Sequence, residues 1–397
     1  MEQRLNVNFI SVEVDDNPDV SFGVHYPINP EVYRCFLEGK ACPASFIRGI
    51  HVYFDEQGRI QDPLASIFYI LNCLGEGSSL INSTDPHGRL LFKESIYSDY
   101  HDPYTDLLTP LMRSFLKNYA GVEHIDSFGK RQVLLSHDID FLRSGFKQEL
   151  LYFFRNPEWD LAVRLVKHLF TGNKLWSNIR AITALEKEFE YRSVFYFLPK
   201  SGSYNGVTNA DYKVPEMRAA MDMVYENNME CGLHKSTSDL SYHEEVCRLG
   251  QNVKSNRNHF LRYNLPDSWK EISEAYIPLD AGLGWSDQEG LRNGYPAPFN
   301  PYGIELTVVP LVLMDTTFYN RKKGVSMVGA FSEMQSCWPD GYCVTILFHN
   351  NYLTPWSNKF YLDQYRQLLE YLKKEEIEVI LTSDIIQDYA PKMDECI

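Results

Sequence analysis

The sequence lacks the features that mark several classes of protein. Its eight cysteines contain no CxxC pair and are too sparse for a disulfide scaffold, which fits buried thiols in a reducing compartment. Its longest apolar stretch of note, Val308 to Met314, is far shorter than the ~20 residues that a membrane-spanning helix needs. The first residues lack the apolar centre of a secretory signal. We therefore expect a cytoplasmic protein without a membrane span.

Basic residues are also in the minority. Lysine and arginine total 38 against 53 aspartates and glutamates, and the resulting net charge of −15 argues against a nucleic acid as partner. With 44% hydrophobic and 23% charged residues, the composition excludes disorder and low complexity. At roughly 100–200 residues per domain, a chain of 397 residues is expected to form two or three folding units.

The first part of the chain, residues 1–128, has short elements separated by turn signals. An apolar stretch covers residues 50–54, and helices are expected over 62–76, which opens with an aspartate and a proline, and over 107–121. No catalytic pattern stands out in this part. We predict a small α/β domain without an assigned role.

The second part, residues 129–397, alternates short β-rich apolar runs with helical patterns, as parallel α/β folds do. This order predicts a distorted (β/α) barrel of seven or eight parallel strands. The expected strands are 132–136, 193–198, 230–233, 252–255, 276–279, 305–314, 342–348 and 378–382. The expected helices lie around 149–170, 175–191, 214–228, 240–249, 266–275 and 358–375.

Polar and titratable side chains follow most of the expected strands. The carboxyl ends of parallel barrel strands converge on one face, where barrel enzymes place their chemistry, so we expect these side chains to form an active site. The set comprises His137, Asp138 and Asp140 after the first strand, His234 after the third, Arg257 and His259 after the fourth, and Asp280, Asp315, His349 and Asp384 at the last four.

A metal site is the favoured interpretation of this rim. Asp138 and Asp140 would repel each other on one face unless a metal or a shared proton relieves them, which suggests one metal ligand and one general base; a solvated turn is the alternative. His234 would add an imidazole, and one carboxylate with two imidazoles is an accepted catalytic site for zinc. His349 would be a general acid or a structural residue. Arg257 would orient a carboxylate, bind an anion or lie in a surface loop.

Five short motifs, in order, resemble those of the polysaccharide deacetylase family, the NodB-type carbohydrate esterases with a distorted (β/α) barrel. More closely, the whole chain resembles a bacterial subgroup in which a small N-terminal domain precedes the barrel. The motifs are LSHDIDF with Asp138 and Asp140, GLHKS with His234, NRNHFLR with Arg257, DAGLGW with Asp280 and Trp285, and LFH with His349.

The resemblance implies a metal-dependent hydrolase of carbon–nitrogen amide bonds that removes N-acetyl groups from an amino sugar in a glycan or glycan precursor. It also implies a divalent metal, with zinc as the expected ion, held by Asp140 and His234. The chain departs from the family pattern at Ser238, where a second ligand histidine is usual. His259 could supply the missing ligand, and Asp239 is a weaker candidate.

The resemblance further implies a role for each remaining rim residue. Asp138 would take a proton from the attacking water, and Arg257 would hold Asp138 in place. His349, oriented by Asp280, would protonate the leaving amine. Trp285 would stack on a sugar ring or serve only in packing.

Two other functions remain open from the sequence. A decayed deacetylase-like barrel could bind a glycan or scaffold a biosynthetic partner, and Ser238 is the feature in its favour. A glycosidase could use Asp138 and Asp140 without a metal. The sequence leaves the sugar, the identity of the metal and the oligomeric state undetermined.

Overall fold

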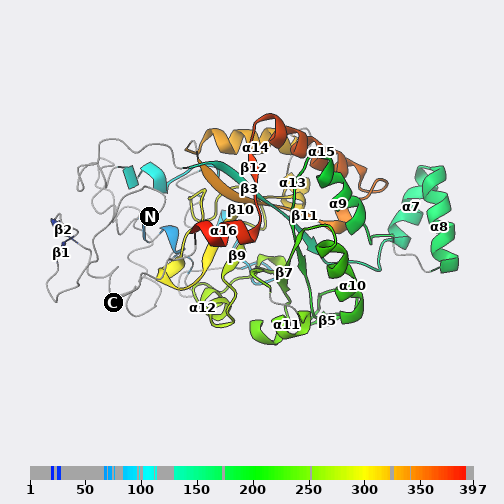
Figure 1. Cartoon of the computed structure of the whole chain (residues 1–397), viewed down its shortest axis with the longest axis horizontal. Coiled ribbons are helices and arrows are strands. Elements are labelled where there is room, and N and C mark those ends of the chain that lie inside the picture. Colours follow the sequence, from blue (N-terminus) through cyan, green and yellow to red (C-terminus); the bar gives the residue numbers. More distant parts are fainter. Residues whose placement is uncertain are drawn as a thin grey trace.

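Seven parallel strands close into a barrel, and an eighth strand lies beside it (Figure 1). The computed structural model of the chain describes residues 19–21, 25–27, 67–68, 70–73, 76, 84–95, 98, 102–110, 112–113, 129–171, 175–250, 253–321, 326–339 and 341–389. The barrel strands are β3 (Arg131–Ile139), β4 (Val194–Phe197), β7 (Glu230–Lys235), β8 (Ser255–Asn258), β9 (Leu279–Leu283), β10 (Thr307–Met314) and β11 (Tyr342–His349). The predicted fold class is confirmed.

The distortion of the barrel is located at β3. One edge of β3 pairs with β11 along eight residues, which closes the ring. The other edge is shared, because β4 pairs with its last residues, Ser136–Ile139, while β12 (Glu378–Val379) pairs with Gln132 and Val133. The eighth strand therefore fills the space that opens between β3 and β4 at the start of the barrel.

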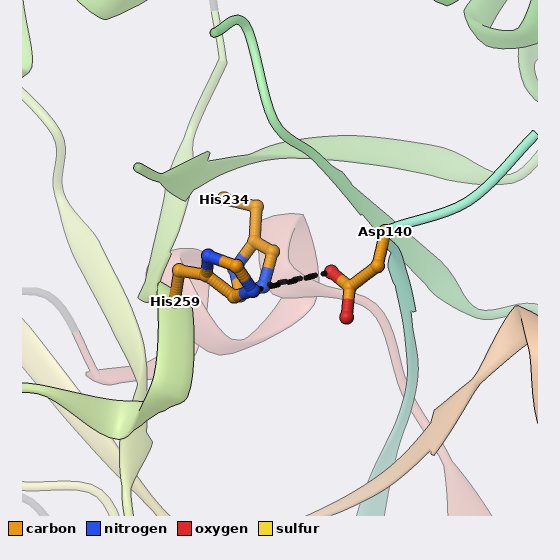
Figure 2. A group of neighbouring side chains, drawn as sticks. All are labelled: Asp140, His234 and His259. Carbon is orange, nitrogen blue, oxygen red and sulfur yellow. Dashed lines mark ion pairs between the residues drawn. The ribbon is translucent and has the colours of Figure 1, made fainter. Parts of the chain in front are cut away.

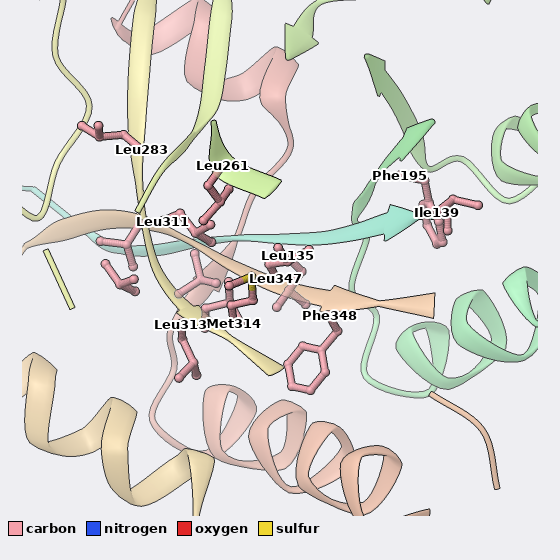
Figure 3. Close-up of a cluster of buried hydrophobic side chains, with 14 of the residues drawn as sticks. Leu135, Ile139, Phe195, Leu261, Leu283, Leu311, Leu313, Met314, Leu347 and Phe348 are labelled. Carbon is pink, nitrogen blue, oxygen red and sulfur yellow. The ribbon is translucent and has the colours of Figure 1, made fainter. Parts of the chain in front are cut away.

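Alternate residues of the buried strands face two separate cores. Inside the barrel, Leu134, Val194 and Leu279 pack with Ile385 of α16 (Thr382–Tyr389), which closes the amino-terminal end of the strands. The larger core lies between the strands and the surrounding helices, and Figure 3 shows the part of it around β3, β10 and β11. Apolar side chains thereby fill the amino-terminal end of the barrel interior, and the candidate site residues lie at the opposite, carboxyl end.

Helices cover the outside of the barrel (Figure 1). Those that the sequence predicted are α9 (Ile179–Glu188), α10 (Val214–Tyr225), α11 (Tyr242–Leu249), α12 (Asp267–Glu274) and α15 (Lys359–Lys374). The sequence did not predict α13 (Asp315–Arg321), α14 (Met327–Ser336) or α16.

The single helix predicted over 149–170 is wrong. The chain forms two helices there, α7 (Phe146–Arg155) and α8 (Trp159–Thr171). Residues 156–158 separate them, because Pro157 lacks a backbone N–H and disfavours helical geometry at the preceding residue. The strands β8 and β9 also begin three residues later than predicted, so Arg257 and Asp280 lie within strands instead of after them.

The structure describes only parts of the chain before the barrel. Strands β1 (Asp19–Ser21) and β2 (His25–Pro27) pair antiparallel, and the described residues within 67–71 and 108–113 are helical. The predicted apolar stretch 50–54 lies outside the described residues, and the boundary at residue 128 stays a prediction. Within the described residues, none of the helices combines the length and hydrophobicity that a membrane crossing demands.

Candidate metal centre

One carboxylate and two imidazoles meet at the carboxyl end of the barrel (Figure 2). Asp140 follows β3, His234 is in β7, and His259 begins the short 3-10 turn η3 (His259–Leu261) after β8. All three are buried, and one ligand atom of each lies within 4.8 Å of the others. The neighbouring strands of the sheet thus bring together residues that are separated by up to 119 positions in sequence.

Each imidazole is oriented by a partner at Nδ1. The Nδ1 atom of His234 donates to the carbonyl oxygen of Arg257 at 2.9 Å, and that of His259 donates to Oδ1 of Asn209 at 3.3 Å. These bonds leave the Nε2 lone pairs directed at the Oδ1 atom of Asp140, which is 3.5 Å from His234 and 3.8 Å from His259. Metal-binding histidines have this arrangement, with the second nitrogen held by a polar group.

The residues fit a metal ion. Nε2 of His234 and Oδ1 of Asp140 are buried without a hydrogen-bond partner, which costs ~1–3 kcal/mol for each such group. Two ligand atoms that bind one tetrahedral zinc ion at ~2.0–2.2 Å are about 3.3–3.6 Å apart, close to the distances observed here. A cation at this position would satisfy both atoms at once.

A strained turn brings His259 into this group. Phe260, the next residue, has a φ of 61°, a left-handed conformation that is uncommon for a bulky residue. Its ring lies 4.0 Å from the ring of His259 and stacks at 4.7 Å on that of His87. The turn and its stacking partners keep the His259 imidazole against His234.

Ser238 is engaged elsewhere. Its hydroxyl lies 2.8 Å from that of Ser236 and donates to Oε1 of the buried Glu245 at 3.2 Å. Glu245, on α11, also accepts from the backbone N–H of Ser236 at 2.9 Å, so it fixes the whole loop after β7. Asp239 is exposed and is not part of the cluster. Of the two substitutes considered for the absent histidine, the structure brings His259 to the site.

Asp138 lies beside the cluster and is held by Arg257. Nη1 of Arg257 donates to Oδ1 of Asp138 at 2.8 Å, while Nη2 donates to Oγ of Ser136 and to the carbonyl oxygen of Ala281. Burial favours the neutral acid, but the charges of His234 and Arg257 outweigh it and lower the pKa of Asp138. Asp138 is therefore a fixed carboxylate next to the candidate ligands.

His349 approaches the same group from β11. Its Nε2 atom is 4.0 Å from Oδ2 of Asp140, and its Nδ1 atom is 2.7 Å from Oδ1 of Asp315. Asp315 also accepts the backbone N–H of His349 at 2.6 Å. Burial lowers the pKa of His349, but the Asp315 carboxylate more than compensates and raises it to about 10. The Asp315 carboxylate thus favours the protonated form of the imidazole.

The predicted pairing of His349 with Asp280 is wrong. Oδ1 of Asp280 accepts from Asn256 at 2.9 Å and from the Tyr263 hydroxyl at 2.9 Å. Burial raises the pKa of Asp280 to about 6. The shift of β9 places Asp280 inside the strand, on the face opposite the cluster. Asp315 had been recognised at a strand end, but its position one residue past β10 did not by itself indicate its partner.

Of the two roles considered for Trp285, stacking on a sugar or packing, the structure supports packing. Its side chain is buried, its Nε1 atom donates to the carbonyl oxygen of Leu291 at 3.2 Å, and the Arg292 guanidinium lies 5.2 Å from its ring. It packs the structure and offers no open face to a sugar.

A pocket of about 290 Å³ opens onto the cluster. Asp138, Asp140, His259 and His349 line it together with residues from outside the barrel. The latter are His87 and Arg89, and Arg89 is fixed by an ion pair with Asp85 at 2.6 Å. No sequence pattern pointed to His87 or Arg89, because only the folded chain brings segment 84–95 over the barrel.

We compared the chain with protein families, curated proteins and solved structures. No protein-family model matches the chain, and no curated protein is matched. The chain is structurally similar to polysaccharide deacetylases. The similarity extends to a protein from Mycobacterium smegmatis assigned to that group, with a TM-score of 0.42, 13% identity, and coverage of 68% of this chain and 92% of that one.

Two further solved structures show the same remote likeness. One is a mutant of the peptidoglycan deacetylase PdaC from Bacillus subtilis, with a TM-score of 0.34, 10% identity, and coverage of 66% and 92%. The other is a CE4 family pseudoenzyme from Bacillus anthracis, with a TM-score of 0.35, 11% identity, and coverage of 66% of each chain. These neighbours thus include proteins named as deacetylases and one named as a pseudoenzyme.

Proposed function

We propose that the protein is a metal-dependent hydrolase that removes N-acetyl groups from an amino sugar. The supporting observation is the juxtaposition of three units beside one pocket, each with at least one residue in its lining: the Asp140, His234 and His259 cluster, the Asp138–Arg257 pair and the His349–Asp315 pair. A ligand set, a fixed carboxylate and a charged imidazole are the groups that hydrolysis of an amide requires.

Asp140, His234 and His259 would hold the divalent ion, for which zinc is our proposal because the ligands are nitrogen and oxygen atoms. When bound, such an ion polarises a carbonyl and lowers the pKa of a water molecule. Asp138 accepts the proton of the attacking water, and Arg257 keeps its carboxylate charged and in position. His349 donates a proton to the leaving amine, with Asp315 orienting the ring and stabilising its charge.

The substrate class rests on the motif resemblance and on the pocket. About 290 Å³ is at the lower end of small-molecule sites, which suits one sugar ring with its acetamido group. Ser238 had favoured a decayed, binding-only barrel, but in this proposal His259, which lies beside Asp140 and His234, takes the third ligand position. With His259 as the third ligand, the main reason to expect an inactive site no longer applies.

The first experiment measures metal content by mass spectrometry on protein purified without chelator, for the wild type and His234→Ala. We expect about one equivalent in the wild type and a large loss in the variant. Absence of metal from both, after zinc or cobalt is offered, would contradict the metal site and favour a binding-only protein.

The second experiment measures acetate release from N-acetylated amino sugars. Asp138→Asn should keep the metal and the fold but lose turnover by ~10²–10⁴-fold, the contribution of a positioned acid or base. Unchanged turnover would exclude Asp138 as the base. Acetate release that survives a chelator would contradict the role of the metal, whereas new reducing sugar ends without acetate, formed in the presence of chelator, would point to a metal-independent glycosidase.

A further inference from the structure

The helical hairpin of α7 and α8 exposes an unusual amount of apolar surface. Seven of the ten large hydrophobic side chains exposed in the described part of the chain belong to it. Trp159 is 82% exposed and Phe170 is 85% exposed. The hairpin lies at one end of the molecule, apart from the helices that cover the barrel (Figure 1).

One face of α8 is already packed within the chain. Leu161 and Leu165 are buried in a cluster with Leu175, Trp176 and Trp356, and His168 stacks on Phe146 of α7 at 4.5 Å. The exposed residues therefore form a second apolar face, which the hairpin does not need for its own packing.

This second face has the spacing of a coiled-coil seam. Trp159, Val163, Val166 and Phe170 are separated by four, three and four residues, so they lie along one side of the helix. We call these four residues the α8 seam. We propose that the α8 seam packs antiparallel against the α8 seam of a second copy of this chain.

The charged residues beside the α8 seam match those of a second copy when the two helices run antiparallel. Asp160 and Lys167 each follow a seam residue and lie on the same flank. Consider an antiparallel pair in which Trp159 lies opposite Phe170 of the second copy. Asp160 and Lys167 of the second copy are then offset by about 3 Å along the helix axis, since the rise is ~1.5 Å per residue. Two-fold symmetry repeats this pair of opposite charges on the other side of the interface.

The same charges argue against a lipid surface. Helices that lie on membranes carry a predominantly basic polar face. Asp160 interrupts such a face here, and the guanidinium of Arg164 lies 5.1 Å from the ring of Trp356 within the chain. The net charge of −15 would also oppose approach to an anionic membrane.

The area that the α8 seam could bury is near the lower limit for a stable pair. Trp159 and Phe170 of two copies would bury on the order of 500–800 Å², at ~150–250 Å² for each of the four side chains and the exposed fractions of 82% and 85%. The valines of the seam and the neighbouring Leu169, which is 68% exposed, add to this value. The total approaches the ~1,200 Å² of a standard interface.

The test measures molar mass by light scattering over a concentration series. The wild type should approach twice 46.1 kDa, while Trp159→Ser with Phe170→Ser should remain at 46.1 kDa. Both side chains are exposed, so the variant should keep its fold, which circular dichroism checks. Phe360→Ser, at an exposed position on α15 outside the hairpin, is the matched control and should associate like the wild type.

Charge reversal tests the orientation. Asp160→Lys alone and Lys167→Asp alone should each weaken association at least tenfold, because each creates two like-charge contacts. The double reversal should restore it. A wild type that stays monomeric, or a dimer that is unaffected by the seam variant, would overturn the proposal. A monomer that sediments with anionic vesicles would overturn it too and assign the seam to lipid.

Discussion

Arg257 depends on the packing of two residues beneath it. The ring of Tyr196 lies 4.4 Å from the Arg257 guanidinium inside the barrel, and Gly232 of β7 leaves room for that ring. A Cβ atom at position 232 would lie 2.4 Å from the ring and 2.8 Å from Oγ of Ser255. The absence of one side chain thus helps to place the guanidinium that holds Asp138.

We therefore expect Gly232→Ala to lower the free energy of unfolding by ~1–3 kcal/mol, the usual cost of overpacking a core. Chemical denaturation measures this change. Tyr196→Leu in the same background, with a smaller side chain below the arginine, should recover part of the loss. An unaltered midpoint in Gly232→Ala would show that the ring moves aside without cost.

The contact between Asp315 and His349 predicts the effect of a second single substitution, this time on turnover. Asp315→Asn removes the negative charge that stabilises the protonated His349, so acetate release should fall by up to the ~10²–10⁴-fold that a positioned acid contributes. Metal content should be retained. Asp280→Asn is the comparison, and its effect on turnover should be smaller. The reverse order would restore Asp280 as the partner of His349.

Among the elements, α16 has a clear structural task. It follows β12 and inserts Ile385 into the amino-terminal end of the barrel, against Leu134 and Val194. Removal of this side chain leaves a cavity in a rigid interior. Ile385→Ala should therefore cost ~2–5 kcal/mol in unfolding free energy, whereas Gln387→Ala on the exposed side of the same helix should be within ~0.5 kcal/mol of the wild type. Equal effects of the two would mean that α16 does not close the barrel.

The elements also show what could be predicted from the sequence. Apolar runs revealed five of the seven barrel strands (β3, β4, β7, β10 and β11), since strands buried on both faces are almost continuously hydrophobic. The runs assigned to β8 and β9 share only one residue each with the observed strands, and β8 has the polar sequence SNRN, which no apolar pattern marks. The start of β9 was misjudged by three residues, and this shift assigned Asp280 to the rim. The cluster itself was predicted because its residues follow strands, while His87 and Arg89 come from a distant segment and only tertiary contacts bring them to the pocket.

At the scale of the whole molecule, the chain before the barrel is tied to it by a buried ion pair. Nη2 of Arg292 is 2.5 Å from Oε2 of Glu76, and Nε donates to Oε1 at 3.0 Å. Both side chains are almost completely buried, and the Tyr104 hydroxyl donates to Glu289 at 2.8 Å near the same surface. These contacts indicate that the barrel is stabilised by residues that precede it.

Loss of the Glu76 charge should therefore destabilise the whole chain. Glu76→Gln leaves the Arg292 guanidinium buried without a counter-charge, and breaking a buried pair in this way costs ~3–5 kcal/mol. The exposed pair of Arg366 with Glu188, 2.8 Å apart, provides the control, because Glu188→Gln should change stability by no more than ~1 kcal/mol. Denaturation followed by tryptophan fluorescence compares the two. A single transition at lower denaturant for Glu76→Gln is expected, since both ends of the pair unfold together. Separate transitions for the two parts, with the barrel transition unchanged, would show that the barrel is stable without the preceding residues.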